Sequence, residues 1–344
     1  MNENLPSKES RAASTASPGD AGTGPSARWV IPYIDQPLDF WQGLAEQHGE
    51  AVREVYFPLP TSIIGSGEPT QPSQHLDDLL RKGPFGCSVL LNPLTLPRPV
   101  EDVAPRVVEA LRRLVGDYRV VGATVTNPTL ARRVREAFPA LHLAASCLTM
   151  ISRPNQIAMI DGVYDSLVPG NRVMRDLPAL KALKKAFPGS VRLIVNEACL
   201  PGCPWRVQHF HEMGSDFPYP LSLCSELLGE QPWLRLTGGW VLPQHLHLYE
   251  GTYDDLKLAG RVTLRNPDKY RRVLDAYIHR RPLLANQIGG GPASVQEPIP
   301  ITEAFFANTL DCDGDCRTCS FCHDYHAAAT RLLREKRRKA SSTT

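Results

Sequence analysis

Seven of the nine cysteines in this chain fall into two groups, and their type and spacing indicate metal chemistry. The first group consists of Cys199, Cys203 and Cys224. Deprotonated cysteines bind soft metals, because each thiolate carries a charge that a cation offsets. Four thiolates form the ligand set of an iron–sulfur cluster or of a structural zinc site, so the sequence predicts a metalloprotein. The second group packs four cysteines into a short stretch near the C-terminus: Cys312, Cys316, Cys319 and Cys322.

The second group has the spacing C-x3-C-x2-C-x2-C, which is close to a reversed ferredoxin run. Zinc sites usually pair two dithiol halves across a longer spacer, whereas closely spaced thiolates fit the corners of a cubane cluster. We therefore expect iron–sulfur ligation in this tail, with zinc as the alternative. The first three cysteines also have the spacing of radical S-adenosylmethionine enzymes. In those enzymes the triplet normally follows the first strand of a barrel. Here it begins at Cys312, after the barrel should have closed, so we do not expect a radical enzyme of that kind.

The first group follows an apolar run, and its spacer contains Pro201, which restricts the backbone and helps to preorganise the sulfurs of Cys199 and Cys203. Free cysteines also occur in protein cores as small apolar residues. The strand-end position and the polar neighbours of this group favour a metal site. A histidine from the following stretch, His209 or His211, is a candidate for completing the set.

Polar residues around the first group are candidates for catalysis. Glu197 is suited to general acid or base catalysis, and His209 to proton transfer near neutral pH. The alternative for His209 is an ordinary hydrogen bond within a loop. Arg172 and Arg261 are suited to binding a carboxylate or phosphate, although a lone arginine more often forms a surface ion pair.

The composition excludes several function classes. The 344 residues carry a formal net charge of +2, which is too mild to indicate a nucleic-acid-binding protein. The basic stretch 331–339 is expected to be a solvated helix face, with contact to RNA as the alternative. No stretch approaches the roughly 20 apolar residues of a membrane span. Cysteines at metal-like spacings without an export signal predict a cytoplasmic protein.

Short apolar runs alternate with amphipathic segments along most of the chain. Eight strand candidates separated by helices or long loops favour a parallel sheet, which a (β/α)8 TIM-like barrel closes economically at this length. A doubly wound open sheet is the alternative, but no G-x-G-x-x-G fingerprint follows a strand. The expected strands are 29–34, 52–57, 87–91, 119–124, 141–145, 162–168, 192–195 and 255–258. The clearest expected helices are 103–115, 128–137, 177–186 and 267–280.

In such barrels the reactive groups lie on the loops after the C-terminal ends of the strands. The polar residues that follow the runs should therefore share one face of the barrel. The long segment between the last two runs holds Cys203 and Cys224 and is predicted to be an elaborated loop on that face rather than a plain helix. The residues expected on the face are Asn92, Asn127, Cys147, Asn171, Arg172, Asn196, Glu197, Cys199 and Arg261.

Three regions are predicted. Residues 1–28 are rich in Ser, Ala, Gly and Pro and are expected to form a disordered leader rather than a signal peptide. Residues 29–285 form the barrel. Residues 286–344 form a cysteine-rich metal-binding tail with a basic helix, beyond the Gly/Pro-rich linker Gly289–Pro292.

Two stretches resemble the collagenase-like peptidase family U32, namely Asn196–Arg206 and Trp240–Arg261. In that family a stretch similar to Asp254–Arg261 ends a barrel strand, usually with an acidic residue where this chain has Ala259. The resemblance covers roughly residues 52–281. It does not by itself imply proteolysis. Better understood relatives are iron–sulfur proteins that carry out oxygen-independent hydroxylation in ubiquinone synthesis or on transfer RNA, some with prephenate as oxygen donor.

The resemblance implies one 4Fe-4S cluster on four cysteines near the barrel mouth. Three such positions match the first cysteine group, and no cysteine between residues 224 and 312 supplies the fourth. Either a tail cysteine such as Cys312 folds back, or Cys147 or a histidine joins, or one iron stays open as a Lewis acid. The remaining tail cysteines are then available for a second cluster.

The expected function is that of an iron–sulfur oxidoreductase or hydroxylase that carries out oxygen-independent hydroxylation, or a related redox change, of a small organic substrate. An electron-transfer or heteromeric protein partner is expected besides the substrate. The alternatives are a metal-dependent peptidase of the collagenase-like type and a tRNA-modifying protein. The residues expected to line the pocket are Asn196, Glu197, Arg172, His209 and Arg261.

Overall fold

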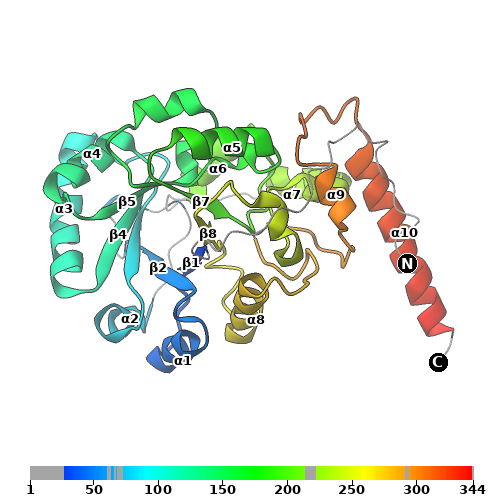
Figure 1. The fold of residues 1–344 in the computed structure, drawn as a ribbon, viewed down its shortest axis with the longest axis horizontal. Coiled ribbons are helices and arrows are strands. Elements are labelled where there is room, and N and C mark those ends of the chain that lie inside the picture. The colour runs from blue at the N-terminus through cyan, green and yellow to red at the C-terminus, as the bar shows by residue number, and fades with distance from the viewer. Residues whose placement is uncertain are drawn as a thin grey trace.

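Eight parallel strands close into a barrel in sequence order, with β1 paired to both β2 and β8 (Figure 1). The computed structural model describes residues 27–59, 63–65, 67, 73–213, 222–290 and 294–342. The predicted TIM-like barrel is confirmed, and the open sheet is wrong because no strand is left with an unpaired edge. The strands are β1 (Arg28–Pro32), β2 (Val52–Pro58), β3 (Cys87–Leu91), β4 (Val120–Val125), β5 (His142–Ala145), β6 (Ser166–Leu167), β7 (Ser190–Ile194) and β8 (Asp255–Lys257).

Helices cover the outside of the barrel, and their bounds follow from local capping. Asn127 accepts a hydrogen bond from the amide of Leu130 at 3.0 Å, and Asp176 accepts one from Ala179 at 2.9 Å. Each cap is followed by a proline in the first turn, so both helices begin where the sequence predicts. These helices are α1 (Leu38–His48), α2 (Leu76–Lys82), α3 (Val100–Asp117), α4 (Pro128–Ala137), α5 (Leu177–Ala186) and α8 (Pro267–Ile278).

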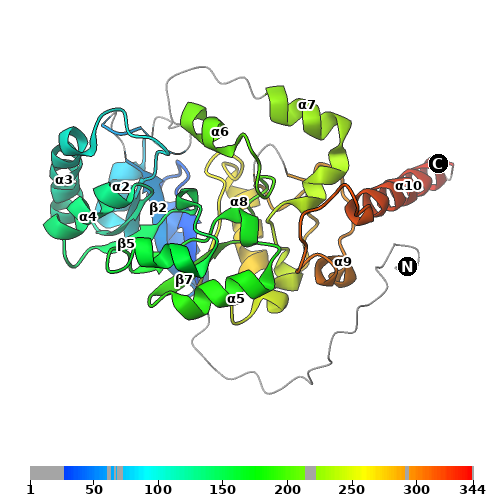
Figure 2. The ribbon, with the colours of Figure 1, turned by 90° about the horizontal axis from the view of Figure 1, so that it is seen from above.

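In its described residues, which leave out 214–221, the segment between β7 and β8 contains four short helices instead of one long one, as expected for an elaborated loop. In Figure 2 its first two helices, α6 and α7, lie together at one edge of the view. The loops after β5 and β6 are also irregular. The helices between β7 and β8 are α6 (Arg206–Met213), α7 (Ser222–Glu230), η4 (Pro232–Thr237) and η5 (Pro243–Tyr249). The 3-10 helices after β5 and β6 are η1 (Cys147–Thr149), η2 (Pro154–Met159) and η3 (Asn171–Val173).

A buried ionic cluster ties the strands together inside the barrel. Arg192 of β7 forms ion pairs with Glu54 of β2 at 2.8 Å and with Asp255 of β8 at 3.4 Å. Because β2 and β7 are not neighbours in the sheet, the first pair crosses the barrel interior. The Arg192 side chain is only 1% exposed, so each charge depends on its partner for compensation.

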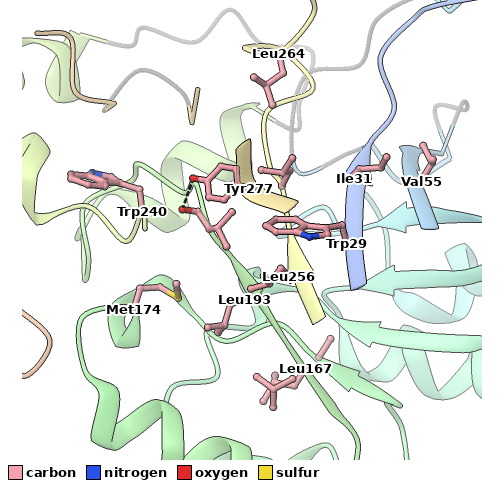
Figure 3. Packing of buried hydrophobic residues seen from close by; sticks show 14 of the residues in the cluster. Trp29, Ile31, Val55, Leu167, Met174, Leu193, Trp240, Leu256, Leu264 and Tyr277 are labelled. Carbon is pink, nitrogen blue, oxygen red and sulfur yellow. Dashed lines mark hydrogen bonds between the residues drawn. The ribbon is translucent and has the colours of Figure 1, made fainter. Parts of the chain in front are cut away.

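The C-terminal segment packs onto the barrel through α9 (Glu303–Ala307) and α10 (Phe321–Ser341). Phe305 and Phe306 are buried in the same apolar cluster as Trp29 of β1 and Tyr277 of α8. Figure 3 shows Trp29 beside Tyr277, with ring centroids 5.4 Å apart. In Figures 1 and 2, α10 lies at the end of the molecule opposite α3.

The predicted division into leader, barrel and tail stays a prediction. Most of the leader, residues 1–26, lies outside the described residues, and Arg28 already belongs to β1. Within the described ranges, no helix is both long enough and apolar enough to cross a bilayer. The cytoplasmic location also stays a prediction.

Candidate metal centre

Cys147 joins the first cysteine group at the C-terminal end of the barrel. Burial, together with the charges of Glu197, Cys147 and Cys224, raises the pKa of the Cys199 thiol to about 12. Burial and the charge of Cys203 raise the pKa of Cys224. Because such charge effects weaken with distance, these four sulfurs are neighbours. The loop after β5 thus supplies the fourth cysteine to the group on the β7–β8 segment.

Short polar contacts position the loops that carry these cysteines. Asn171 of η3 donates from Nδ2 to the carbonyl oxygens of Cys199 at 3.3 Å and Leu200 at 3.2 Å. Gly202 has a φ of +65°, which allows the tight turn between Cys199 and Cys203. Ser146, between β5 and Cys147, accepts a hydrogen bond from the amide of Leu148 at 3.2 Å. The loops after β5, β6 and β7 therefore meet around the cysteines.

Arg206 places a buried positive charge beside these thiols. Its Nη2 lies 2.7 Å from a carboxylate oxygen of Glu197 in an ion pair, and its guanidinium stacks 4.8 Å from the ring centroid of Phe210. Its Nε and Nη1 atoms have no hydrogen-bond partner among the described residues. Although burial lowers its pKa, the charges of Glu197, Cys199 and Cys147 outweigh burial and raise it. A buried cation with unused donors fits a site for thiolate-bound metal.

The sulfurs of the first group are not as close together as the ligands of a single bound ion. Within the described residues, no three cysteine sulfurs lie within 4.8 Å of one another. A tetrahedral zinc with bonds of 2.3 Å brings its sulfurs to about 3.8 Å apart. Thiolates around an iron–sulfur cluster stand farther apart, because the iron atoms of the cluster lie between them. The four residues supply the number of thiolates that either a zinc site or an iron–sulfur cluster uses.

A different group has the close spacing that a single ion needs. His48 of α1 lies near Asp275 of α8 and the C-cap residue His279 directly after that helix, and their candidate ligand atoms are all within 4.8 Å of one another. Asp275 also forms an ion pair with Arg281 at 2.7 Å. This arginine already supplies the positive charge that an ion would bring.

The side chain of Asn196 joins neighbouring loops through hydrogen bonds. Its Nδ2 donates to the carbonyl oxygens of Ala259 at 2.9 Å and Ile288 at 3.2 Å, and its Oδ1 accepts from the Ala259 amide at 2.7 Å. A Cβ atom on Gly290 would lie 2.2 Å from the Asn196 carbonyl oxygen, so the chain passes very close here. Asn196 thus joins the loops after β7 and β8 to the segment that leads to the tail.

The other predicted polar residues occupy different parts of the same face. Glu197 is buried and paired with Arg206, which leaves it poorly placed as a general base. Burial and the charge of Arg206 lower the pKa of His209, so its neutral form is favoured. Arg172 is exposed on η3, and Arg261 is partly buried after β8. His211 of α6 forms a hydrogen bond with Thr95 rather than lying with the sulfurs.

Lys257 and Arg175 are buried cations that sequence reasoning missed. Lys257 ends β8, and its Nζ lies 4.2 Å from the ring centroid of Tyr56 on β2. Because β2 and β8 are separated by β1, this contact lies inside the barrel. A charged residue within a buried apolar run was the available signal. Arg175, in the loop after η3, had no comparable signal in the sequence.

The structure places Cys312 with the other tail cysteines. Burial raises the pKa of Cys322 to about 12; the charge of Arg175 lowers it, and the charges of Cys312, Cys316 and Cys319 raise it. The eight cysteines other than Cys87 are thus divided between two groups of four, and all nine are free of disulfides. Cys312 is predicted to be the fourth cysteine of the first group, but in this structure Cys147 lies beside that group instead.

Comparison with known proteins found relatives but no matching family model. The chain is 22% identical over 248 residues to an uncharacterized protease of Methanocaldococcus jannaschii, a match that spans 66% of this chain and 72% of that protein. Among solved structures, a U32 peptidase matches with a TM-score of 0.49 and 13% identity, over 70% of this chain and 96% of its own. The tryptophan synthase α-subunit of Pyrococcus furiosus matches with a TM-score of 0.37 and 10% identity, over 76% of this chain and 97% of its own.

Proposed function

We propose, from the relationship of this chain to the U32 peptidases, that it is an iron–sulfur enzyme acting on a small organic substrate. The reaction proposed is an oxygen-independent hydroxylation or a related redox change. The observation that carries the proposal is the convergence of four cysteines beside Arg206: Cys147, Cys199, Cys203 and Cys224. When bound there, a 4Fe-4S cluster supplies one-electron transfer.

The surrounding residues have separate tasks in this proposal. Arg206 offsets the negative charge of the thiolates, while Glu197 keeps the buried arginine from being an unpaired cation. Asn171 holds the backbone at Cys199, and Asn196 holds the ends of β7 and β8 together. His209, with a lowered pKa, is available as a neutral proton acceptor near the site.

The cations on this face suit a substrate with a carboxylate or phosphate group. Lys257 lies inside the barrel at the end of β8, and Arg261 follows the same strand. A thermal-shift series of small carboxylic acids, each paired with its neutral amide, tests this assignment. We expect some acids, but not their amides, to raise the melting temperature, and K257Q or R261Q to remove the effect. Equal shifts from acids and amides would contradict it.

A metal-dependent peptidase is the second candidate, because the curated relative carries a protease name. In such an enzyme a carboxylate commonly activates the metal-bound water. The carboxylate nearest the cysteines, Glu197, is instead engaged by Arg206 at 2.7 Å. This arrangement favours the redox function over hydrolysis.

Anaerobic purification followed by iron and sulfide analysis tests the proposed function. Replacing Cys199 and Cys203 together by serine should remove one cluster, about four iron atoms per chain. Cys87→Ala is the matched control, because Cys87 is buried in β3 and belongs to neither group. Iron content unchanged by C199S/C203S, or peptide cleavage in air by zinc-loaded protein, would overturn the proposal.

A further inference from the structure

The tail cysteines lie on a short folded segment that is anchored to the barrel. Asp311, directly before Cys312, pairs with Asp176 in an isolated β-bridge, and the amide of Leu177 donates to the Leu310 carbonyl at 2.9 Å. The residues between Cys312 and α10 form turns, in which the Cys319 amide donates to the Asp315 carbonyl at 3.2 Å. The segment is thus anchored next to the start of α5 directly before Cys312.

Cys319 and Cys322 are partly buried against the hydrophobic core. Cys322 lies in the first turn of α10, a helix of 21 residues. The N-terminal end of a helix carries a partial positive charge and free amide groups, which work against the burial that raises the pKa of the Cys322 thiol. The remaining two cysteines, Cys312 and Cys316, are exposed on the outer side of the segment.

Arg175 is a buried cation beside this segment. Its Nε donates to the Gly238 carbonyl at 3.1 Å, and its Nη1 donates to Thr309 Oγ1 at 3.4 Å. Its Nη2 has no hydrogen-bond partner among the described residues, and no carboxylate there pairs with the guanidinium. Stacking on Phe306, 4.4 Å from the ring centroid, fixes its orientation.

A buried, unpaired guanidinium is costly unless a negative charge lies nearby. Arg175 lies close enough to Tyr249, Cys322 and Cys312 for the charges of these groups to act on it. The tail thiolates therefore provide the compensation that no carboxylate supplies. Arg206 likewise lies beside Cys199 and Cys147, although Glu197 also pairs with it, so each group of four cysteines has its own buried arginine.

We propose that Cys312, Cys316, Cys319 and Cys322 hold a second iron–sulfur cluster, with Arg175 as its buried counter-cation. This site lies outside residues 52–281, to which the U32 resemblance extends, and it does not depend on the function proposed for the first group. The close C-x3-C-x2-C-x2-C spacing, without the longer spacer that usually separates the two dithiol halves of a zinc site, favours a cluster over zinc.

The two groups are linked by packed structure. Asn171 contacts the backbone at Cys199, and Arg175, only four residues later, lies beside the tail. η4 packs against both α7, which carries Cys224, and α10, which carries Cys322. The two centres therefore share one rigid neighbourhood while their ligands come from separate segments, so each should load independently.

Metal content of the full chain tests the site. After anaerobic reconstitution with ferrous iron and sulfide, we expect about eight iron atoms in the unaltered chain and about four in C316S/C319S. The matched variant C199S/C203S should also retain about four, with a different EPR spectrum after reduction by dithionite. Far-ultraviolet circular dichroism checks that each variant is folded.

Two results would overturn the second cluster. One is full iron and sulfide in folded C316S/C319S. The other is loss of stoichiometric zinc, rather than iron, from that variant.

A redox titration tests Arg175 as the counter-cation. Removing a positive charge disfavours the more negative, reduced state of a nearby cluster. We therefore expect R175Q to shift the midpoint potential of the tail cluster to a more negative value and leave the other centre unchanged, and R175K to restore it in part. An unchanged tail potential in folded R175Q would overturn this role.

Discussion

At the residue scale, the first cysteine group is organised by one buried ion pair. Arg206 is 6% exposed in its side chain and Glu197 10%, so both charges are largely removed from water. In the buried pair each charge compensates the other. The guanidinium of Arg206 also lies next to Cys199 and Cys147. The same two residues therefore contribute to stability and to the charge balance of the proposed site.

We predict that Arg206→Gln destabilises the fold and weakens iron binding. Removing one partner of a buried ion pair typically costs about 3–5 kcal/mol, because the other charge stays buried and uncompensated. Urea denaturation and iron analysis measure the two effects. Arg172→Gln, an exposed arginine on η3, is the control and should change stability by less than about 0.5 kcal/mol. Equal behaviour of the two variants would contradict the assignment.

At the element scale, the ends of β7 and β8 are held by close backbone approaches rather than by side chains alone. Gly290 has a φ of +111°, and its Cα hydrogen faces the Asn196 carbonyl in a space that admits no Cβ. Inside the barrel, the contact of Arg192 with Glu54 fastens β7 to β2. The C-terminal face thus depends on strand ends that tolerate little movement.

Gly290→Ala should be more destabilising than Gly251→Ala. Both glycines have positive φ, which costs a side chain about 1–2 kcal/mol, but only at Gly290 would the new Cβ meet a backbone atom, at 2.2 Å. At Gly251 nothing lies within 4 Å of that position. Thermal denaturation of the two variants measures the difference. Equal melting temperatures would show that the Asn196 segment can move aside.

The pH dependence of stability should report the ionic cluster inside the barrel. Burial raises the pKa of Glu54, but the charges of Arg192 and His142 and the Ser88 hydroxyl outweigh it and lower the pKa below the unfolded value of 4.5. The unfolded state then binds more protons in acid, so this contribution is complete above about pH 4.5 and is lost as pH falls through the folded-state pKa.

The test is urea denaturation of Glu54→Gln between pH 7 and pH 3. At pH 7 we expect a loss of about 3 kcal/mol, because Arg192 loses the closer of its two carboxylate partners, and below pH 4.5 a shallower dependence than in the unaltered chain. Glu109→Gln on the exposed face of α3 is the control and should retain the steep dependence. If the free energy of unfolding falls equally steeply with pH in Glu54→Gln and Glu109→Gln, carboxylates other than Glu54 cause the acid sensitivity.

At the scale of the whole molecule, the C-terminal segment is part of the barrel's packing. Phe305, Phe306 and Tyr325 are buried, and Phe306 packs edge-to-face against Trp240 with ring centroids 5.6 Å apart. The last turns of α10, from Arg334 onward, are exposed and basic. The segment therefore has an inner part that completes the core and an outer part that does not.

Two truncations should separate these parts. Ending the chain after residue 285 should give an insoluble or non-cooperatively unfolding protein, because it uncovers aromatic core surface. Ending it after residue 334 should leave the melting temperature and iron content unchanged. If RNA co-purifies with the full chain and is lost as the salt concentration rises, the chain that ends after residue 334 should no longer bind RNA. A stable, cooperative 1–285 fragment would show instead that the tail is an independent domain.

The sequence by itself determined the barrel and the existence of two cysteine groups. The strand runs were recognisable because parallel strands are buried on both faces, and helices such as α4 and α5 carry their own start signals in Asn127 and Asp176. Local spacing also brought the tail cysteines together. These features depend on neighbours along the chain.

Only the tertiary structure decided which residues share each group. Cys147 and Cys199 meet because closure of the barrel brings the loops after β5 and β7 together, and Cys312 stays with the tail because Asp311 is bridged to Asp176. The same closure brings the Asn196 side chain into hydrogen-bond contact with the loop after β8, and it places Arg175 beside the tail. These contacts join residues far apart along the chain, and no spacing in one sequence encodes them.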